Sequence, residues 1–418
     1  MSGIQFQFND ENYYRYSSSG ANFMETTGPV GLIALPGTEE YVEKVNQHLY
    51  NLRLNTVQKY PSFLSSEPGF MRNNYIVDAE ITRFASGEAK ATLHDTVRGH
   101  DLYIFSDVTN RFTSYKMFGM EVPMSPDEHF HNIKRVILAA NNKARRVSVV
   151  MPYLYQGLQD KRNSRESLDA ANMLKELNRM GVDVIMTFEP HEPRVENAIP
   201  LYGIENIPTS FNLLQALIED NEEVDFADPE QAIIISPDET GMKRATYYAS
   251  MLGVQVGTFF RERDYSVKVN NENPIINFNY LGTDLDGKIA VIIDDIIFSG
   301  ETVTRTAKTL KEELNAKSVI MLSTYPLLTH GLEVVDQAYE AGHIDKIYGT
   351  NLSAHSDELL ARPWYRDVDI SNMTAELIDA LNHQASISGI LDQSSQIAAM
   401  LQESKDRQRF RKLDELSK

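Results

Sequence analysis

The stretch Ile289-Ala-Val-Ile-Ile-Asp-Asp-Ile-Ile-Phe-Ser-Gly-Glu-Thr302 is the most informative part of this 418-residue chain. Its first five residues are apolar and predict a short buried strand. Two adjacent carboxylates, Asp294 and Asp295, follow that strand, and a Ser-Gly-Glu-Thr turn then opens a predicted helix over Val303–Leu314. The segment therefore predicts a strand–turn–helix unit of an α/β sheet.

The turn has the chemistry of a phosphate site. A helix N-terminus offers unpaired N–H groups and partial positive charge, Gly300 allows close approach of the backbone, and the Ser299 and Thr302 hydroxyls add donors. Asp294 and Asp295 cannot bind phosphate but suit the hydroxyls of an attached sugar, so we interpret the segment as a site for ribose 5-phosphate. The plainer alternative is an ordinary strand–turn–helix with two solvated acids. A Walker loop is excluded because no Gly-Lys-Ser/Thr follows.

Outward from this segment, apolar β-rich runs alternate with amphipathic helical stretches, which predicts a parallel α/β architecture. The predicted strands are Val30–Leu35, Leu102–Ser106, Val147–Met151, Val182–Phe188, Ala232–Ser236, Val254–Phe260, Ser318–Ser323 and Lys346–Thr350. The predicted helices are Glu39–Leu52, Asp127–Asn142, Arg165–Met180, Thr240–Leu252 and Asn372–Asn382. The polar motifs follow the carboxyl ends of strands, where α/β sheets bind ligands.

The turn resembles the 5-phosphoribosyl diphosphate (PRPP) loop of the type I phosphoribosyltransferase fold. An ordered set of further motifs makes the chain similar to the ribose-phosphate diphosphokinase (PRPP synthetase) family from about Gly31 to about Asn351. These motifs are Arg83-Phe-Ala-Ser-Gly-Glu88, Val97-Arg-Gly-His-Asp-Leu-Tyr-Ile-Phe105, Val149-Val-Met-Pro-Tyr-Leu-Tyr155, Gln159-Asp160, Ser164-Arg-Glu-Ser167, Pro190-His191 and Ser236-Pro-Asp238.

The resemblance implies two tandem phosphoribosyltransferase-type domains, each a mainly parallel sheet flanked by helices. We expect an N-terminal extension over residues 1–29, a nucleotide-side domain over 30–205, a ribose 5-phosphate domain over 206–370 and a C-terminal helical extension over 371–418. The charged end of the last segment is interpreted as a solvated or oligomer-packing helix.

The resemblance also implies the reaction, which is transfer of a diphosphoryl group from Mg-ATP to ribose 5-phosphate to give PRPP and AMP. The residues implied to bind ribose 5-phosphate are Asp294, Asp295, Phe298, Ser299, Gly300, Glu301 and Thr302. Those implied to bind ATP are Phe84, Ser86, Glu88, Gln159, Asp160, Arg165 and His191. In the family, Phe84 and Glu88 serve an adjacent subunit, which implies at least a dimer, and hexamers are common.

His191 and Asp238 are implied to contact the Mg²⁺ cofactor. Magnesium prefers oxygen ligands, so His191 would act through a water or on a phosphate oxygen. Arg261 and Arg263 are the implied catalytic cations, because forked donors suit a transition state with dispersed charge.

Three departures from the family pattern keep other functions open. Leu158 replaces an arginine of the ATP site, Arg-Glu-Arg over residues 261–263 replaces Lys-Arg-Arg, and Ser86 replaces an acid or amide. The chain is therefore either an active PRPP synthetase or a catalytically weak relative that binds nucleotide or ribose phosphate and regulates a partner. A phosphoribosyltransferase that uses PRPP is a third possibility, but it leaves the first half of the chain unexplained.

The amino-acid composition limits the class of protein, the partners and the cellular location that we expect. The chain is 42% hydrophobic and 24% charged, which is typical of a soluble globular protein. Its net charge of −19 argues against nucleic-acid or anionic-membrane partners. It lacks an apolar run of about 20 residues and a secretory signal pattern, so we expect no membrane span. The absence of cysteine fits a cytoplasmic protein.

Overall fold

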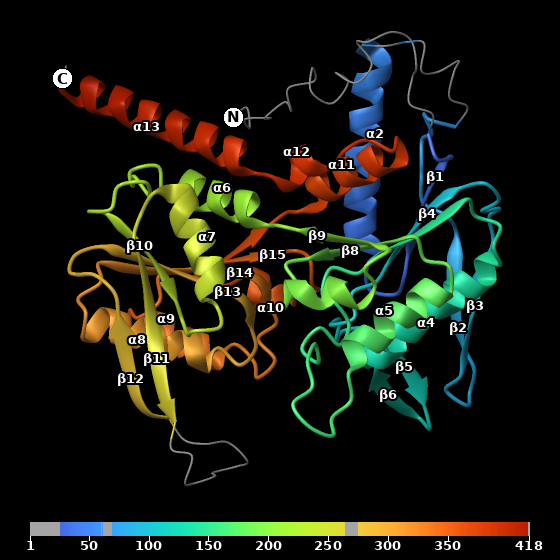
Figure 1. Cartoon of the computed structure of the whole chain (residues 1–418), viewed down its shortest axis with the longest axis horizontal. Helices are drawn as coiled ribbons and strands as arrows, with labels where there is room; N and C mark the ends of the chain where they lie inside the picture. The colour runs from blue at the N-terminus through green and yellow to red at the C-terminus, as the bar shows by residue number, and fades with distance from the viewer. Residues whose placement is uncertain (1–25, 60, 62–68, 264–274, 417–418) are drawn as a thin grey trace.

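The computed structural model describes residues 26–416 apart from 60, 62–68 and 264–274, and it contains two α/β sheets side by side (Figure 1). The first sheet is parallel, with the order β1-β4-β7-β8-β9. Its strands are β1 (Val30–Ala34), β4 (Asp101–Phe105), β7 (Arg146–Val150), β8 (Val184–Phe188) and β9 (Gly203–Ile207).

The second sheet has the order β12-β11-β10-β13-β14-β15-β16 and is parallel except for the β11–β12 pair. Its strands are β10 (Ala232–Ser236), β11 (Val256–Arg263), β12 (Ile275–Leu281), β13 (Ile289–Ile297), β14 (Ser318–Pro326), β15 (Lys346–Thr350) and β16 (Tyr365–Val368). From β10 the chain builds outward in one direction and from β13 in the other. The crevice at their carboxyl ends is therefore a topological switch point, where open α/β sheets bind ligands.

Helices cover both faces of each sheet. They are α2 (Glu39–Lys59), α4 (Pro126–Ala140), α5 (Asp169–Arg179), the 3₁₀ helix η2 (Pro193–Ala198), α6 (Ser210–Asp220), α7 (Met242–Leu252), α8 (Glu301–Glu312), α9 (Glu333–Glu340), α10 (Asp357–Leu360), α11 (Ser371–Asn382), α12 (Ser388–Leu391) and α13 (Ser394–Leu416). No helix in the described part of the chain is both long and apolar enough to cross a membrane.

Among the described residues, three buried clusters organise the packing. One is shared by both sheets and includes residues of α2, α6, α7, α11 and α13. A second joins α4 and α5 to the first sheet, and a third joins α8 and α9 to the second. The shared cluster holds the two sheets together, and the buried Tyr325 hydroxyl adds polar contacts at 2.6 Å from the Pro152 carbonyl and 2.7 Å from that of Phe188.

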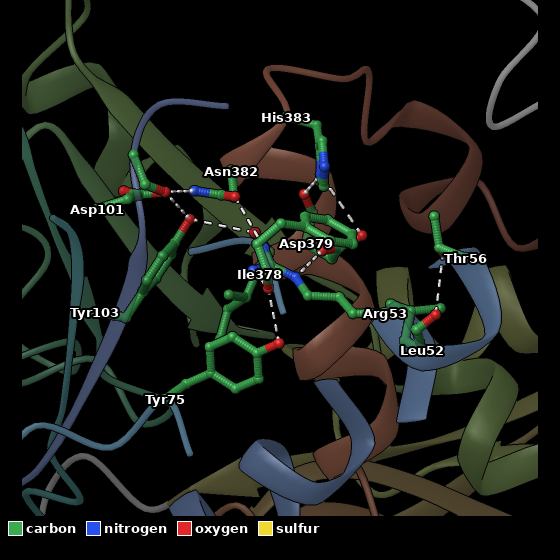
Figure 2. Close-up of polar contacts among 12 residues, drawn as sticks. Leu52, Arg53, Thr56, Tyr75, Asp101, Tyr103, Ile378, Asp379, Asn382 and His383 are labelled. Carbon is green, nitrogen blue, oxygen red and sulfur yellow. Dashed lines mark hydrogen bonds and ion pairs between the residues drawn. The ribbon is translucent and has the colours of Figure 1, made fainter. Parts of the chain in front are cut away.

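The first part of the predicted C-terminal extension is an integral part of the fold. Helix α11 packs along α2, and the buried Arg53 guanidinium donates to the Asp379 carboxylate at 2.7 Å, the Asn382 amide oxygen at 2.9 Å and the Phe70 carbonyl at 3.0 Å (Figure 2). The Asn382 side chain in turn donates to Asp101 at 2.9 Å. This polar network ties α11 to the first sheet.

Helix α13 continues from this point across the second half of the molecule and ends well outside it (Figure 1). Its N-terminal half packs against α6 and α7 through the buried side chains of Ile397 and Met400. Further along, the Gln408 amide donates to the Val224 carbonyl at 2.8 Å. Helix α13 is therefore docked on its own chain as far as about Gln408.

Most predicted elements form near their expected positions, but three strands run further. One is β14, which continues past Ser323 to Pro326. Strand β13 continues through Asp294 and Asp295 to Ile297, because Ile296 and Ile297 extend the buried apolar run. Strand β11 continues through Arg263 by pairing with β12. Strand β9, at the edge of the first sheet, spans the predicted boundary between residues 205 and 206. The expected N-terminal extension lies, apart from residues 26–29, outside the described residues.

Two β-hairpins were not predicted. Strands β2 (Ala79–Arg83) and β3 (Ala89–Leu93) form one, and β5 (Ser114–Met117) and β6 (Met120–Pro123) form the other. The two are neighbours, because the Arg83 guanidinium lies 4.3 Å from the centre of the Tyr115 ring. Both lie on the first domain, away from β13 (Figure 1).

Candidate functional site

A cluster of charged side chains lies where the two sheets meet at the switch point. The Nδ1 atom of His191, which follows β8, lies 2.9 Å from Oδ2 of Asp295 in β13. The Arg244 guanidinium, from the first turn of α7, lies 3.2 Å from the same carboxylate and 3.3 Å from Glu189. These contacts bring a predicted metal ligand and a predicted sugar ligand together across the two domains.

The two adjacent acids of β13 have opposite electrostatic surroundings. Burial raises the pKa of Asp295, but the hydrogen bond with His191 and the charge of Arg244 outweigh it and hold that pKa at about 2. Burial and the charge of Asp295 raise the pKa of Asp294 well above its usual range, and Asp238 adds to this effect. The hydrogen bond with Asp295 raises the pKa of His191 against the effect of burial. The site thus concentrates negative charge around Asp294.

Glu189 and Arg244 were not among the predicted site residues. Glu189 has a φ of 40°, an uncommon conformation for a residue other than glycine. Its carboxylate accepts from the Thr209 backbone N–H at 3.0 Å and from the Thr324 hydroxyl at 3.2 Å. A sequence signal was available for Glu189, which directly precedes the Pro-His motif, but Arg244 carried no such signal.

Asp238 is fixed at the start of the connection from β10 to α7. Its Oδ1 atom accepts from the backbone N–H groups of Thr240 at 2.9 Å and Gly241 at 3.1 Å. It is close enough to Asp294 to raise the pKa of that acid. Asp238 lies near Asp294 while His191 contacts Asp295, so the two predicted magnesium ligands flank the acids of β13.

The predicted phosphate loop has the backbone geometry that an anion site requires. Gly300 is the N-cap of α8, with a φ of 82° in the left-handed region, and it is buried. The Ser299 hydroxyl accepts from the Glu301 N–H at 3.3 Å, while the Phe298 carbonyl accepts from the Thr329 N–H at 2.7 Å. Phe298 and Glu301 are exposed and Thr302 is half-buried, so the loop is open to solvent.

The predicted catalytic arginines lie on a strand instead of a loop. The backbone of Arg261 pairs with Phe278 and that of Arg263 with Ile275, with a register shift between Glu262 and Arg263. The side chains of this segment lie outside the described part of the structure, which resumes at Ile275 after residues 264–274.

The residues predicted to bind ATP occupy two separate places. Phe84, Ser86 and Glu88 form the exposed β2–β3 turn, where the Ser86 hydroxyl donates to Glu88 at 2.9 Å. This turn lies away from β13 in its own chain (Figure 1). Gln159 instead follows β7, with its amide donating to the Ser167 carbonyl at 2.8 Å.

Asp160 and Arg165 belong to the same segment after β7. Asp160 contributes to the raised pKa of His191, so it lies on the side of the charged cluster. Arg165 is exposed. The structure therefore brings Asp160 and His191 to the switch point and leaves the Phe84 turn outside it.

A cavity of about 440 Å³ opens between this segment and the phosphate loop. Residues 155–158 line it on the first domain and Phe298 and Thr329 line it on the second. That volume is typical of a site for a small molecule. The geometry thus places a cleft between the predicted nucleotide side and the predicted ribose phosphate side.

Two tandem α/β sheets, with a glycine turn at a helix N-terminus and acids at the switch point, define a protein of the phosphoribosyltransferase fold class. The model of the N-terminal domain of ribose phosphate pyrophosphokinase matches residues 30–181, and that of the phosphoribosyl transferase domain matches residues 203–345. The chain belongs to the ribose-phosphate pyrophosphokinase, or PRPP synthetase, family.

Individual relatives agree with this assignment. A ribose-phosphate pyrophosphokinase of Thermosipho africanus is 27% identical over 286 residues, which are 68% of this chain and 80% of the relative. One from Vibrio cholerae is 25% identical over 323 residues, which are 75% and 91% of the two chains. The crystal structure of phosphoribosylpyrophosphate synthetase from Mycobacterium smegmatis shares the fold, with a TM-score of 0.65 at 18% identity, over 85% of this chain and all of that one.

The donor set suits the magnesium ion expected from the family. The carboxylates of Asp238 and Asp294 supply oxygen atoms, and the repulsion around Asp294 is of the kind that a divalent cation relieves. Within the described residues, no group of three or more histidine, aspartate or glutamate side chains forms a complete cation cage. Mg²⁺ commonly keeps waters and uses substrate phosphate oxygens, so a site of few protein ligands fits it.

Proposed function

We propose that this protein is a ribose-phosphate diphosphokinase that converts Mg-ATP and ribose 5-phosphate into PRPP and AMP. The observation that carries this proposal is the phosphate loop with buried Gly300 at the N-terminus of α8, beside the cluster of His191, Asp295 and Arg244. Membership of the family supports a transferase role. The nucleotide and sugar are the substrates that this arrangement serves best.

The proposed roles follow from the positions of the groups. The residues from Phe298 to Thr302 bind the 5-phosphate, because the α8 N-terminus carries unpaired N–H groups and positive potential. Asp294 and Asp295 bind the ribose hydroxyls, and Arg244 and His191 hold Asp295 in position. Asp238 would hold the magnesium ion together with Asp294, and His191 would act on it through a water or a phosphate oxygen. The ion would neutralise charge on the triphosphate.

In the proposed reaction, the anomeric hydroxyl oxygen of ribose 5-phosphate forms a bond to the β-phosphorus of ATP. The bond between that phosphorus and the oxygen bridging to the α-phosphate breaks, so AMP leaves with the bridging oxygen and the hydroxyl proton passes to solvent. Positioning and electrostatic stabilisation provide most of the catalysis in phosphoryl transfer. Arg261 and Arg263 would stabilise the developing charge.

We expect Arg263→Ala to lower kcat much more than it raises KM, because the cation acts on charge that develops in the transition state. Loss of one such donor typically costs about 10²–10³ in rate. AMP release at saturating ATP, magnesium and ribose 5-phosphate measures this effect, with Arg261→Lys as the comparison that keeps a cation. An Arg263→Ala variant as active as the parent would show that this strand has no catalytic role.

The second candidate is a weakly active relative that binds nucleotide or ribose phosphate and regulates a partner. Leu158 favours it, because an apolar side chain that is 47% exposed occupies the place of the family's ATP-site arginine. A parent protein that releases no AMP but gains turnover through Arg261→Lys would support this candidate. The same assay therefore separates the two functions.

Self-association belongs to the proposal as well. The β2–β3 turn lies away from the switch point of its own chain, so Phe84, Ser86 and Glu88 would complete the ATP site of a neighbouring copy. This needs at least a dimer, and a hexamer is the larger assembly we consider. A cytoplasmic location remains part of the proposal.

A further inference from the structure

The cavity between the two domains has an asymmetric lining. Most of its lining side chains are apolar or aromatic, including Tyr153, Leu158, Phe298 and Leu327. Among the described residues that line it, Arg111 is the only cation. The acid in the lining, Asp127, already accepts a hydrogen bond from the Tyr155 hydroxyl at 2.6 Å. Among the described residues, Arg111 forms no ion pair with Asp127 or with another acid, so its guanidinium is open to a ligand anion.

Arg111 extends from the first domain to the second. It follows β4, yet its Nη1 atom donates to the carbonyl of Leu328 at 3.2 Å and lies 3.5 Å from that of Leu327. The guanidinium also lies 5.1 Å from the centre of the Phe112 ring. Two contacts to neutral carbonyls do not compensate the charge. Within the described chain, no hydrogen bond from Nε or Nη2 joins them.

Arg111 contacts a segment that packs against the phosphate loop. The Leu328 N–H donates to the Ile297 carbonyl at 3.0 Å, and the Thr329 N–H donates to the Phe298 carbonyl at 2.7 Å. The carbonyl groups that hold Arg111 thus belong to the segment that packs on the start of the loop. On the other side, Leu158 presents an exposed apolar side chain where a ligand phosphate would find no partner.

We propose that Arg111 binds the polyphosphate of the nucleotide substrate in this cleft and so supplies the positive charge that Leu158 does not. The inference rests on the proposed function for the identity of the nucleotide. The two nitrogen atoms without carbonyl partners form a fork that matches two phosphate oxygens. Arg111 is exposed to solvent, so a ligand phosphate can reach its guanidinium.

A purely structural role would have a different signature. If Arg111 only joined the domains through Leu327 and Leu328, its removal would weaken both substrates together and lower the unfolding midpoint. A phosphate ligand on the first domain acts on the nucleotide alone. An arginine introduced at residue 158 would then restore binding, since this side chain is 47% exposed and the change buries no charge.

The test is calorimetry on the full-length chain with a non-hydrolysable Mg-ATP analogue and, separately, with ribose 5-phosphate. We expect Arg111→Ala to raise the analogue's Kd about tenfold or more, the usual effect of losing a hydrogen bond to a charged group, and to leave that of ribose 5-phosphate unchanged. Arg111→Lys should fall between parent and Arg111→Ala. The double variant Arg111→Ala/Leu158→Arg should recover most of the lost affinity.

Lys116→Ala is the matched control, because Lys116 lies on the neighbouring hairpin with 82% of its side chain exposed. It should bind both ligands as the parent does. Unchanged analogue affinity in Arg111→Ala overturns the inference, as does equal loss for both ligands or failure of Leu158→Arg to restore binding. A parent that binds the analogue but forms no PRPP contradicts the proposed function alone. A parent that forms PRPP while Arg111→Ala binds normally contradicts the inference alone.

Discussion

At the scale of single residues, Gly300 is the position where the backbone most directly limits the choice of side chain. Its φ of 82° lies in the left-handed region, and an added Cβ would lie 3.1 Å from Cγ2 of Val335. A branched side chain would therefore strain the turn and crowd the α9 side of the loop. The same turn presents the N–H groups that we assign to phosphate.

We predict that Gly300→Val abolishes ribose 5-phosphate binding, measured by calorimetry on the folded variant. Gly342→Val is the control, because Gly342 has a φ of 74° and open space around its Cβ position. A valine at residue 342 strains the backbone in the same way but lies outside the phosphate loop. The Gly342→Val variant should therefore be less stable than the parent but bind ribose 5-phosphate with the same affinity. Parent-like ribose 5-phosphate affinity in Gly300→Val would rule out this loop as the site.

The charged cluster contains contacts, and one residue, that the sequence motifs did not predict. His191 and Asp295 were each predicted as site residues from their own motifs, but their contact at 2.9 Å joins segments that are 104 residues apart. Arg244 is also central to the cluster, and nothing in its local sequence distinguishes it from a solvated helical arginine. Local patterns therefore indicate which residues are chemically suitable, while the tertiary fold determines which of them meet.

At the scale of elements, the contact between α11 and α2 depends on a buried ion pair. The side chains of Arg53 and Asp379 are each only 1% exposed, and the pair connects residues 326 positions apart (Figure 2). Sequence patterns assign a helical arginine to the surface, so this contact was not predicted. Removing one partner leaves an uncompensated charge in the core, which is strongly destabilising.

We predict that Asp379→Ala lowers the free energy of unfolding by about 3–5 kcal/mol, measured by urea denaturation. Glu40→Ala, which removes an exposed pair with Lys44 on the same helix α2, should cost less than about 1 kcal/mol. Equal losses in the two variants would show that the Arg53–Asp379 pair does not anchor α11.

Glu376, on α11, should make the stability of the fold depend on pH. Burial raises the pKa of this carboxyl from 4.5 to about 7, against the opposing hydrogen bond from Asn372. The folded state therefore holds the proton more tightly than the unfolded state does. The contribution of the protonated Glu376 carboxyl to the stability of the fold is therefore fully present below about pH 4.5, and it is lost as the pH rises through about 7.

We predict that Glu376→Gln raises stability near pH 8 by on the order of 1 kcal/mol, since solvent at this partly exposed site screens the full effect. Near pH 5 the parent carboxyl is neutral, so the two proteins should unfold at similar temperatures. Thermal unfolding across this range checks the prediction. A constant difference at all pH values would show that the Glu376 carboxyl is not the titrating group.

The elements differ in how far sequence could predict them. Strand β10 formed at its predicted bounds, because a continuous apolar run marks a strand buried on both faces. Strand β15 also formed at its predicted bounds, although its sequence, Lys346-Ile-Tyr-Gly-Thr350, is only partly apolar. The end of β13 was misplaced because two aspartates resemble a strand terminus, although Ile296 and Ile297 continue the strand. The β2–β3 hairpin was missed because its strands are short, although Ala79, Ile81, Ala91 and Leu93 alternate with polar residues.

At the scale of the whole molecule, the predicted architecture of two tandem phosphoribosyltransferase-type domains is confirmed by the family models and by the Mycobacterium smegmatis structure. The shared hydrophobic cluster between the sheets, which α11 and α13 complete, was not predictable because its members are spread along nearly the whole chain. The cleft between the domains follows from that packing. It lies between the segment that we propose binds nucleotide and the loop that we propose binds ribose phosphate, as the proposed diphosphoryl transfer requires.

The most direct test of the central claim is ³¹P NMR of the purified protein with ATP, magnesium and ribose 5-phosphate. We predict that the β- and γ-phosphates of ATP move together to the oxygen on the anomeric carbon, giving PRPP and AMP in equal amounts. Production of ADP, or loss of ATP without a diphosphate attached to the sugar, would contradict it. So would a spectrum that stays unchanged while both substrates remain bound.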